Sequence, residues 1–224
     1  MLFLEIIAEI ESQHIAQLEG YLSATGLKDT QLSLEEEQAL LAFDKIKWNS
    51  YRIGDLFTRV KTKKLPYKAN DLPKKAEGKY LLPCLTSSFN NQGLNYFVPK
   101  EGATILKDVI SIPSNSDVYR AYYQSKEFTV LSDAYAICWN FNSLQLTSRQ
   151  YLFLVSCINR VTDLKIYSYK NKLGGWNVVQ DKYLNLPVKN GEIDFYYMDT
   201  LISAIQKTVI KGVVTYRDNK ISDS

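Results

Sequence analysis

The chain ends in a long amphipathic stretch, from Asp194 to Tyr216, that limits the folds open to it. After Asp194, apolar residues recur every three or four positions, which is the spacing of one face of an α-helix. They are Phe195, Met198, Ile202, Ile205, Val209, Val213 and Tyr216. Asp194 is the predicted N-cap, and the helix is predicted to run for about six turns, longer than an average globular helix. Its apolar face needs a covering partner.

The N-terminal residues repeat this pattern. Residues 3–22 carry a stripe at helical spacing, with glutamates on much of the opposite side; the stripe consists of Phe3, Ile7, Ile10, His14, Leu18 and Tyr21. The helix is predicted to end before Gly26, and its stripe needs a partner from this chain or another. His14 is the only histidine. We interpret it as a packed residue, because no second histidine exists to build a metal site.

The segment that joins the N-terminal helix to the central part of the chain is predicted to be partly helical. Ser33 and Glu36 have the spacing of a capping box, which predicts a helix from Ser33 to about Phe43. Arg52 to Phe57 predicts a short helical entry to the central domain. Residues 58–79 are rich in lysine and contain two prolines, which predicts an extended loop.

From Tyr80 onward the pattern changes to short apolar runs closed by turn-forming residues. These runs predict strands at Leu81–Leu85, Tyr96–Val98, Val109–Ile112, Phe128–Leu131 and Ala134–Trp139. A helix is predicted from Arg149 to about Val161, with Thr147 or Ser148 as its N-cap. Leu184–Val188 contains Pro187 and is therefore predicted as an edge strand or an extended exit. The predicted fold class is α/β (α+β), a mixed-sheet domain flanked by long amphipathic helices.

Length and composition support one main domain with appendages. A chain of 224 residues suits this organisation, because about 100–200 residues per domain is usual. We expect a helical spacer over residues 1–44, the main domain over 45–190 and an amphipathic, coiled-coil helix over 191–224. The three cysteines are far apart and form no Cys-x-x-Cys pair, which favours a reducing compartment. Without a signal sequence or a membrane-spanning run, a cytoplasmic location is expected.

The net charge of +3 conceals a strong asymmetry along the chain. Residues 1–44 contain nine acidic residues and one lysine, whereas residues 45–79 contain eleven Lys or Arg and three acidic residues. A basic block of this kind can neutralise phosphates and release counterions from a nucleic acid. The alternative is a solvated surface that keeps the protein soluble. Charge alone does not separate the two.

Three segments are rich in side chains that suit contacts with base edges and phosphates. They are residues 87–95, 114–124 and 169–177, and the alternative is that they are ordinary polar loops with half-buried tyrosines. The Gly174-Gly175 pair either allows close backbone approach or makes a turn. Arg59 is a further candidate for a phosphate contact. The candidate DNA-binding residues are Ser87, Ser88, Asn90, Asn91, Gln92, Asn95, Ser114, Asn115, Tyr119, Arg120, Tyr169, Lys170, Asn171, Lys172, Gly174, Trp176, Asn177, Lys61, Lys63 and Lys64.

The sequence contains none of the common nucleotide-binding, metalloprotease or hydrolase motifs. Glu77, Lys79 and Asp55 imitate the spacing of a metal-dependent nuclease, but Glu77 and Lys79 lie in the lysine-rich loop, which favours chance. We therefore expect a binding module that performs no reaction and needs no cofactor or metal. A metal-dependent nuclease and a module that binds only protein are the alternatives.

The order of these elements resembles the target recognition domain of restriction–modification specificity (S) subunits, of the Type I or Type IIG/IIB-like kind. The resemblance covers about residues 46–216. It rests on Leu82–Thr86 before an Asn- and Gly-bearing loop, Val109–Ile112, Gly174-Gly175, Leu186–Val188 and the ending Gly191–Met198. One departure is the turn Ser114–Asp117, which stands where many relatives have a glycine-rich turn.

The resemblance implies a domain that reads one half of a split duplex DNA site and catalyses nothing. It implies methyltransferase and restriction subunits as partners. An intact S subunit carries two such domains, and this chain has room for one. The chain is then a half-subunit that dimerises through its terminal helices, or a fragment of a longer protein. Recognition loops vary with the target sequence, so individual base contacts do not carry over from relatives.

Overall fold

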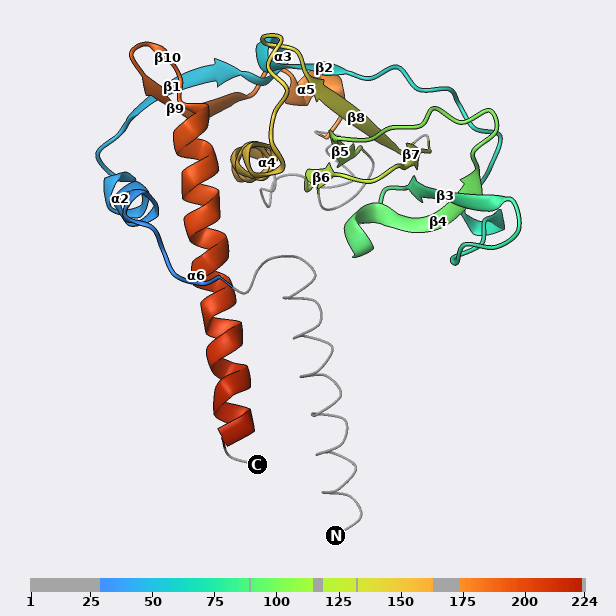
Figure 1. Cartoon of the computed structure of the whole chain (residues 1–224). Helices are drawn as coiled ribbons and strands as arrows, with labels where there is room; N and C mark the ends of the chain where they lie inside the picture. The colour runs from blue at the N-terminus through green and yellow to red at the C-terminus, as the bar shows by residue number, and fades with distance from the viewer. Residues whose placement is uncertain (1–28, 89, 115–118, 132, 163–173, 223–224) are drawn as a thin grey trace. The chain divides into compact units, whose positions relative to one another are not determined.

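The computed structural model describes residues 29–88, 90–114, 119–131, 133–162 and 174–222 (Figure 1). Contacts divide the chain into two compact units, one formed by Ile46–Asp199 and the other by the parts before and after it. The predicted N-terminal helix over residues 3–22 lies outside the described residues. The division into residues 1–44, 45–190 and 191–224 stays a prediction. None of the described helices is long and apolar enough to cross a membrane.

The larger unit contains three small sheets within its described residues. The first has the order β1-β9-β10 and is antiparallel, with β1 at Lys47–Arg52, β9 at Tyr183–Lys189 and β10 at Glu192–Ile193. The second has the order β2-β8-β5-β6 and is antiparallel, with β2 at Phe57–Arg59, β8 at Ala134–Trp139, β5 at Val109–Pro113 and β6 at Tyr122–Gln124.

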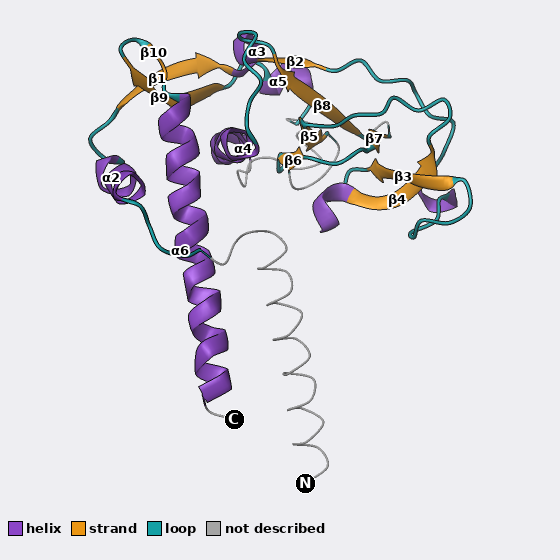
Figure 2. Ribbon diagram, viewed as in Figure 1, coloured by secondary structure: helices purple, strands orange, loops and turns teal. Residues whose placement is uncertain are grey.

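The third sheet has the order β4-β3-β7 and is mixed. Its central strand pairs with one neighbour antiparallel and with the other parallel; the strands are β3 at Tyr80–Leu85, β4 at Leu94–Pro99 and β7 at Thr129–Val130. These strands and those of the second sheet overlap all five predicted strands between Tyr80 and Trp139. Together with the helices they confirm the predicted mixed α/β fold class (Figure 2).

Side-chain caps begin α2 and α6, whereas α3 and α5 have none. The α-helices are α2 at Leu34–Ala42, α3 at Ile53–Leu56, α4 at Ser148–Thr162, α5 at Trp176–Val179 and α6 at Phe195–Ser222. The predicted capping box of α2 is confirmed, because Ser33 and Glu36 each accept the other's backbone N–H. Asp194 accepts a hydrogen bond of 2.9 Å from the N–H of Tyr197, as predicted for the N-cap of α6.

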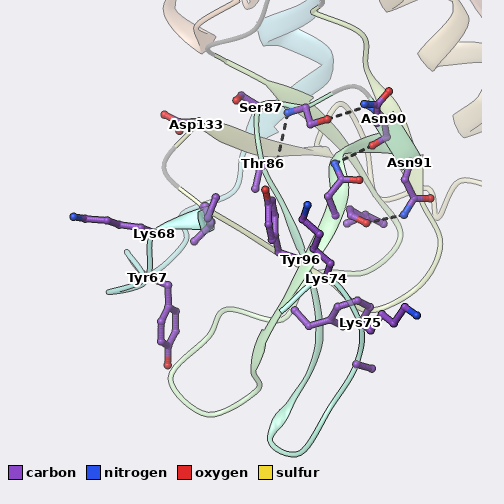
Figure 3. Close-up of a pocket in the computed structure, with 17 residues that line it drawn as sticks. Tyr67, Lys68, Lys74, Lys75, Thr86, Ser87, Asn90, Asn91, Tyr96 and Asp133 are labelled. Carbon is purple, nitrogen blue, oxygen red and sulfur yellow. Dashed lines mark hydrogen bonds between the residues drawn. The ribbon is translucent and has the colours of Figure 1, made fainter. Parts of the chain in front are cut away.

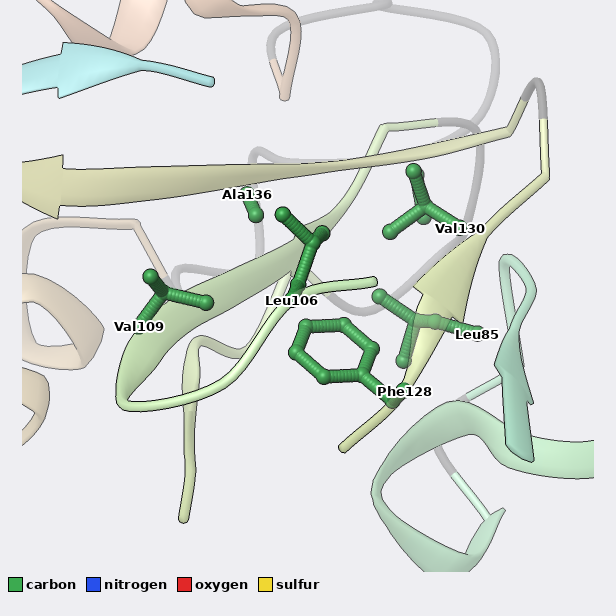
Figure 4. Packing of buried hydrophobic residues seen from close by; sticks show 7 residues of the cluster. Leu85, Leu106, Val109, Phe128, Val130 and Ala136 are labelled. Carbon is green, nitrogen blue, oxygen red and sulfur yellow. The ribbon is translucent and has the colours of Figure 1, made fainter. Parts of the chain in front are cut away.

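Two apolar clusters lie on either side of β3. Leu85 belongs to a cluster with residues of β5, β7 and β8 and with Leu106 and Phe128 (Figure 4). Leu82 and Cys84, two residues apart and thus on the same face of the strand, belong to a second cluster with Leu131. Leu65 and Leu72, from the segment before β3, complete this second cluster. Because both faces of β3 are covered, the loop that follows the strand starts from a fixed position.

The prediction that Leu184–Val188 is an edge strand is wrong, because β9 is the central strand of its sheet. A strand residue directs its N–H and C=O to the same neighbour, and the carbonyl of Pro187 accepts from the N–H of Asp194 at 2.9 Å. A backbone N–H at position 187 would therefore point toward Asp194, which lies after the end of β10 and just before α6. The sheet loses no ladder bond between strands at this proline.

The burial of the predicted apolar stripe of α6 changes along the helix. Met198, Leu201 and Ala204 are buried. In the same helix Ile205, Val209 and Val213 are 43%, 63% and 39% exposed among the described residues. At about 100° per residue, Ile205, Val209 and Val213 lie on the same side of the helix as Met198. The stripe is therefore one continuous face that is buried at Met198 and exposed in its C-terminal part, where it needs a covering partner.

Candidate nucleic-acid interface

An open groove of about 1010 Å³ lies at the end of the third sheet (Figure 3). Uncharged polar residues of the loop between β3 and β4 and of the start of β4 contribute to its lining, namely Thr86, Ser87, Ser88, Asn90, Asn91 and Asn95. The segment before β3 contributes Tyr67, Lys68, Lys74 and Lys75. The groove thus combines the first predicted polar loop with cations from the basic block.

The first half of this loop is held by hydroxyl groups. The N–H of Ser88 donates to the Thr86 hydroxyl at 3.4 Å, and the N–H of Asn90 donates to the Ser88 hydroxyl at 3.2 Å. The N–H of Thr86 donates to the carbonyl of Gly93 at 3.1 Å and closes the loop. Gly93 has φ +84°, and a Cβ there would overlap the side chain of Leu85. Glycine is therefore required at this closing point.

The second half is held by two asparagine amides. The Asn91 side chain donates to the carbonyl of Leu94 at 2.7 Å, and the Asn95 side chain donates to the carbonyl of Asn90 at 3.1 Å. Ser88, Asn91 and Asn95 therefore use polar side-chain atoms to hold the loop itself. Within the described part of the chain, the side chains of Ser87, Asn90 and Gln92 make no hydrogen bond.

The tip of the loop has an unusual backbone. Asn91 has φ 48° and ψ 41°, and Gln92 has φ 56° and ψ 23°. With Gly93 they form three successive residues of positive φ. Asparagine tolerates this left-handed conformation, but for other side chains it costs roughly 1–2 kcal/mol. Strain of this kind is found at functional sites when the surrounding structure enforces it.

The cationic side of the groove is positioned by buried anchors. Leu65 and Leu72 are buried in the cluster beneath β3. The N–H of Phe97 donates to the carbonyl of Pro73 at 3.0 Å and so attaches this segment to the outer edge of β4. Lys74 and Lys75 follow directly and are exposed. The two lysines are thereby held beside the polar loop and remain exposed to solvent.

The predicted cations lie elsewhere in the same basic block. Lys61, Lys63 and Lys64 are exposed and do not line the groove. The backbone N–H of Lys63 donates to the hydroxyl of Thr104 at 2.9 Å. Arg59 lies over the ring of Tyr135, 5.3 Å from its centroid. Sequence reasoning missed Lys68, Lys74 and Lys75, although their closeness to the buried Leu65 and Leu72 was a usable signal.

The second predicted loop begins beside the groove. The N–H of Ser114 donates to the carbonyl of Asp133 at 2.8 Å, and Asp133 lines the groove. Arg120 is exposed, whereas Asn115 lies outside the described residues. Tyr119 requires a correction, because its side chain is 0% exposed and belongs to the core. Its hydroxyphenyl ring is covered by protein and has no surface to offer a nucleic acid.

The third predicted loop is described only at its end, and Tyr169, Lys170, Asn171 and Lys172 lie outside the described residues. Gly174 is buried, and a Cβ at this position would overlap the ring of Tyr119. Its carbonyl accepts from the hydroxyl of Tyr135 at 2.9 Å. Gly174 is therefore a packing residue, which corrects its assignment to the DNA contacts.

The last two candidates of the third predicted loop, Trp176 and Asn177, lie at the start of α5. Trp176 is half-buried and packs edge-on against Tyr135, with ring centroids 6.2 Å apart. Asn177 is exposed. Neither lines the groove, so among the described candidates the structure brings together the first loop, three lysines and, through Asp133, the start of the second loop.

A smaller cleft of about 390 Å³ was not anticipated from the sequence. It contains Tyr123 and Tyr151, whose rings stack with centroids 4.7 Å apart. The Tyr123 hydroxyl donates to Asp108 at 2.8 Å. Burial raises the pKa of Tyr151 to about 12. The phenol of Tyr151 is therefore uncharged at neutral pH, and the stacked pair joins β6 to α4.

The residues of the nuclease alternative do not form a metal-ligating group. Asp55 is bonded to Arg52 at 3.1 Å on α3. Glu77 and Tyr80 form an isolated bridge before β3, and Lys79 lies over the Tyr80 ring. Among the described residues, no three His, Cys, Asp or Glu side chains are grouped closely enough to hold a metal ion.

Sequence comparison connects this groove with a known family. Residues 45–218 match the family described as the Type I restriction modification DNA specificity domain. The chain belongs to this family. The match includes every described residue of the groove and both corrected positions. The resemblance of residues 46–216 to a specificity subunit is thereby confirmed.

This specificity domain is similar to solved structures from Type I restriction–modification systems. One, described as the structural basis of complex assembly and conformational transition of the Type I R-M system, has a TM-score of 0.51, with 12% identity over 98% of this chain and 54% of that chain. The S subunit from M. genitalium has a TM-score of 0.48, with 14% identity over 98% of this chain and 51% of the other.

The HsdS subunit from Thermoanaerobacter tengcongensis has a TM-score of 0.48, with 13% identity over 96% of this chain and 52% of the other. This specificity domain thus spans about half the length of the solved structures that it matches. No curated protein matches it in sequence.

Proposed function

We propose that the chain reads part of a duplex DNA sequence and that the groove holds a stretch of the sugar–phosphate backbone. The strongest support is that Lys68, Lys74 and Lys75 line the same groove as a loop that carries amide side chains. Lysine ammonium groups bind phosphates as compact charges. In this proposal the loop amides that make no internal hydrogen bond, those of Asn90 and Gln92, are available for base edges, where donors and acceptors carry the sequence information.

The lysines and the amides contribute to binding in different ways. Each phosphate neutralised by a lysine releases counterions, so the logarithm of the binding constant falls with the logarithm of salt concentration by about 0.9 per phosphate contact. This contribution is the same for every sequence. An amide that contacts a base edge changes which sequence is preferred and has little effect on the salt dependence.

Charge-removing variants of the groove test this proposal. Lys74→Gln and Lys75→Gln in the full chain are each expected to weaken binding to all duplexes alike. Each is expected to reduce the salt slope by about one unit, because one phosphate contact is lost. Fluorescence anisotropy with one duplex of random sequence, at several salt concentrations, measures both quantities.

Lys189→Gln is the matched control, because Lys189 is exposed at the end of β9 and does not line the groove. Wild-type binding that does not respond to salt, or groove variants that bind like the control, would contradict the proposal. A triple variant of Lys61, Lys63 and Lys64 in the same assay decides whether these exposed lysines add phosphate contacts outside the groove.

We further propose that the chain is a non-catalytic specificity component that directs methyltransferase and restriction subunits. Family membership supports this, and one solved structure with the same fold is described as an assembly of the Type I R-M system. Because the chain spans about half of those structures, two copies or a longer chain would supply the second half-site. The domain division proposed from the sequence assigns the terminal helices to the contacts between copies.

The partner proposal is tested by co-expression with a methyltransferase subunit of a Type I system. We expect co-purification, and we expect DNA methylation only when the chain is present. Sedimentation of the isolated chain determines whether it is a monomer or a dimer. A methyltransferase that neither binds the chain nor depends on it would contradict the proposal.

A further inference from the structure

Gln92 differs from the other amides of the groove loop. Asn91 and Asn95 donate to backbone carbonyls and hold the loop in shape. Gln92 lies at the tip and is exposed, and its amide makes no hydrogen bond within the described part of the chain. The fold of the loop therefore gains no contact from this side chain.

The backbone conformation at position 92 is unfavourable for a glutamine. Its φ is 56°, a left-handed conformation that glycine and asparagine adopt at lower cost than glutamine. Asn190, in the turn between β9 and β10, has φ 54° and is an asparagine followed by a glycine, the residue types that such a turn favours. At position 92 the chain carries a longer amide instead, in a conformation that disfavours it. A role outside the fold explains this choice.

We propose that Gln92 reads an adenine from the major groove of the bound duplex. This assignment rests on the proposed function of the groove. A glutamine amide presents one donor and one acceptor, which match N7 and the N6 amine of adenine in a bidentate contact. Asn91 and Leu94, on either side of the tip, line the groove, whereas Gln92 does not. The exposed tip is therefore adjacent to the proposed backbone site and outside it, which leaves the Gln92 amide available for a base edge.

Selection from random duplexes with the full chain tests this assignment. The wild type is expected to enrich a motif that includes an adenine at one position. Gln92→Ala is expected to enrich the same motif with that position degenerate. The preference for adenine there should fall by roughly 5- to 100-fold, as for the loss of one bidentate contact. Gln92→Glu is expected to shift the preference at this position to cytosine, whose N4 amine donates to a carboxylate.

Gln92→Gly separates recognition from folding. Glycine adopts the left-handed conformation freely, so this variant is expected to melt at or above the wild-type temperature while losing the preference for adenine. Asn190→Gly is the matched control, because it makes the same kind of backbone change outside the groove. It is expected to retain the complete motif.

The possible outcomes separate failure of the Gln92 assignment from failure of the proposed function of the groove. If the wild type enriches a motif and Gln92→Ala enriches the identical motif, Gln92 is not a reader, and the proposed function stands. If the position that becomes degenerate is not an adenine, the assignment of the base is wrong. If the wild type enriches no motif, the proposed function fails and this assignment fails with it.

Discussion

Thr129 shows how a single buried atom limits stability. Its hydroxyl oxygen, in β7, is buried and has no hydrogen-bond partner within the described part of the chain. In the parallel ladder with β3, Thr129 lies opposite the buried Cys84. An unpaired buried hydroxyl costs about 1–3 kcal/mol of desolvation. The hydroxyl of Thr162, by contrast, is buried and bonded to the carbonyls of Tyr119 at 3.1 Å and Ile158 at 2.9 Å.

We expect Thr129→Val to increase the free energy of unfolding by about 1 kcal/mol, because valine keeps the shape and removes the unpaired hydroxyl. Urea unfolding of the full chain measures the change. Thr162→Val is the matched control and is expected to decrease the free energy of unfolding by about 1 kcal/mol, because two carbonyls lose a donor. Equal effects of the two substitutions would show that hydrogen bonding is not what distinguishes them.

At the scale of helices, α2 and α6 are joined by one charged cluster in the smaller unit. Glu36 of α2 accepts from the Ser203 hydroxyl at 2.7 Å and from the Lys207 ammonium at 3.0 Å. Lys207 also donates to the carbonyl of Gln31 at 2.9 Å and lies 3.4 Å from Asp29. Glu36 thus completes its own capping box and also binds a helix distant in the sequence.

The charge of Glu36 makes this contact dependent on pH. Burial raises the pKa of Glu36, but hydrogen bonds from the Ser33 backbone, Ser203 and Lys207 outweigh burial and lower the pKa from 4.5 to about 2. The carboxylate of the unfolded chain protonates first as pH falls. The stabilisation is therefore complete above about pH 4.5 and is lost as the pH falls from there toward 2.

We expect Glu36→Gln to decrease the free energy of unfolding by about 1–2 kcal/mol at pH 6, because a charged hydrogen-bonded pair is lost. The difference from the wild type should shrink as pH falls below about 4.5. Urea unfolding at a series of pH values measures it. A difference that stays constant down to pH 3 would contradict the role of the charge.

At the scale of the whole molecule, the sequence predicts elements where local patterns are strong. From β3 to β8, every strand except β6 was predicted, because their apolar residues are closed by turn formers, and α4 was predicted because Tyr151, Leu154, Val155 and Ile158 share one face. β6 was missed because Tyr122–Gln124 falls in the segment interpreted as a polar loop. β1 was missed because its polar sequence, Lys47–Arg52, is a strand only through pairing with β9. The central position of β9, the strand that contains Pro187, likewise depends on its pairing with β1 and β10.

Only part of the groove could be predicted from the sequence, because the rest depends on tertiary structure. The polar loop follows an apolar strand and was predicted, but its internal division between Asn91, which holds the loop, and Gln92, which does not, depends on backbone angles. Lys61 and Lys74 are alike in sequence, and only the buried Leu65 and Leu72 determine which lysines reach the groove. Tyr119 was assigned to the surface because its sequence neighbours are polar.

The separation of loop-holding side chains from the exposed amide has a consequence for evolution. Ser88, Asn91, Gly93 and Asn95 maintain the scaffold, so position 92 is limited by its left-handed backbone and not by side-chain hydrogen bonds within the described part of the chain. If Gln92 reads a base as proposed, single substitutions at the tip would change the target preference, and selection would detect each change. On this proposal, specificity would change in small steps while the loop scaffold stays the same.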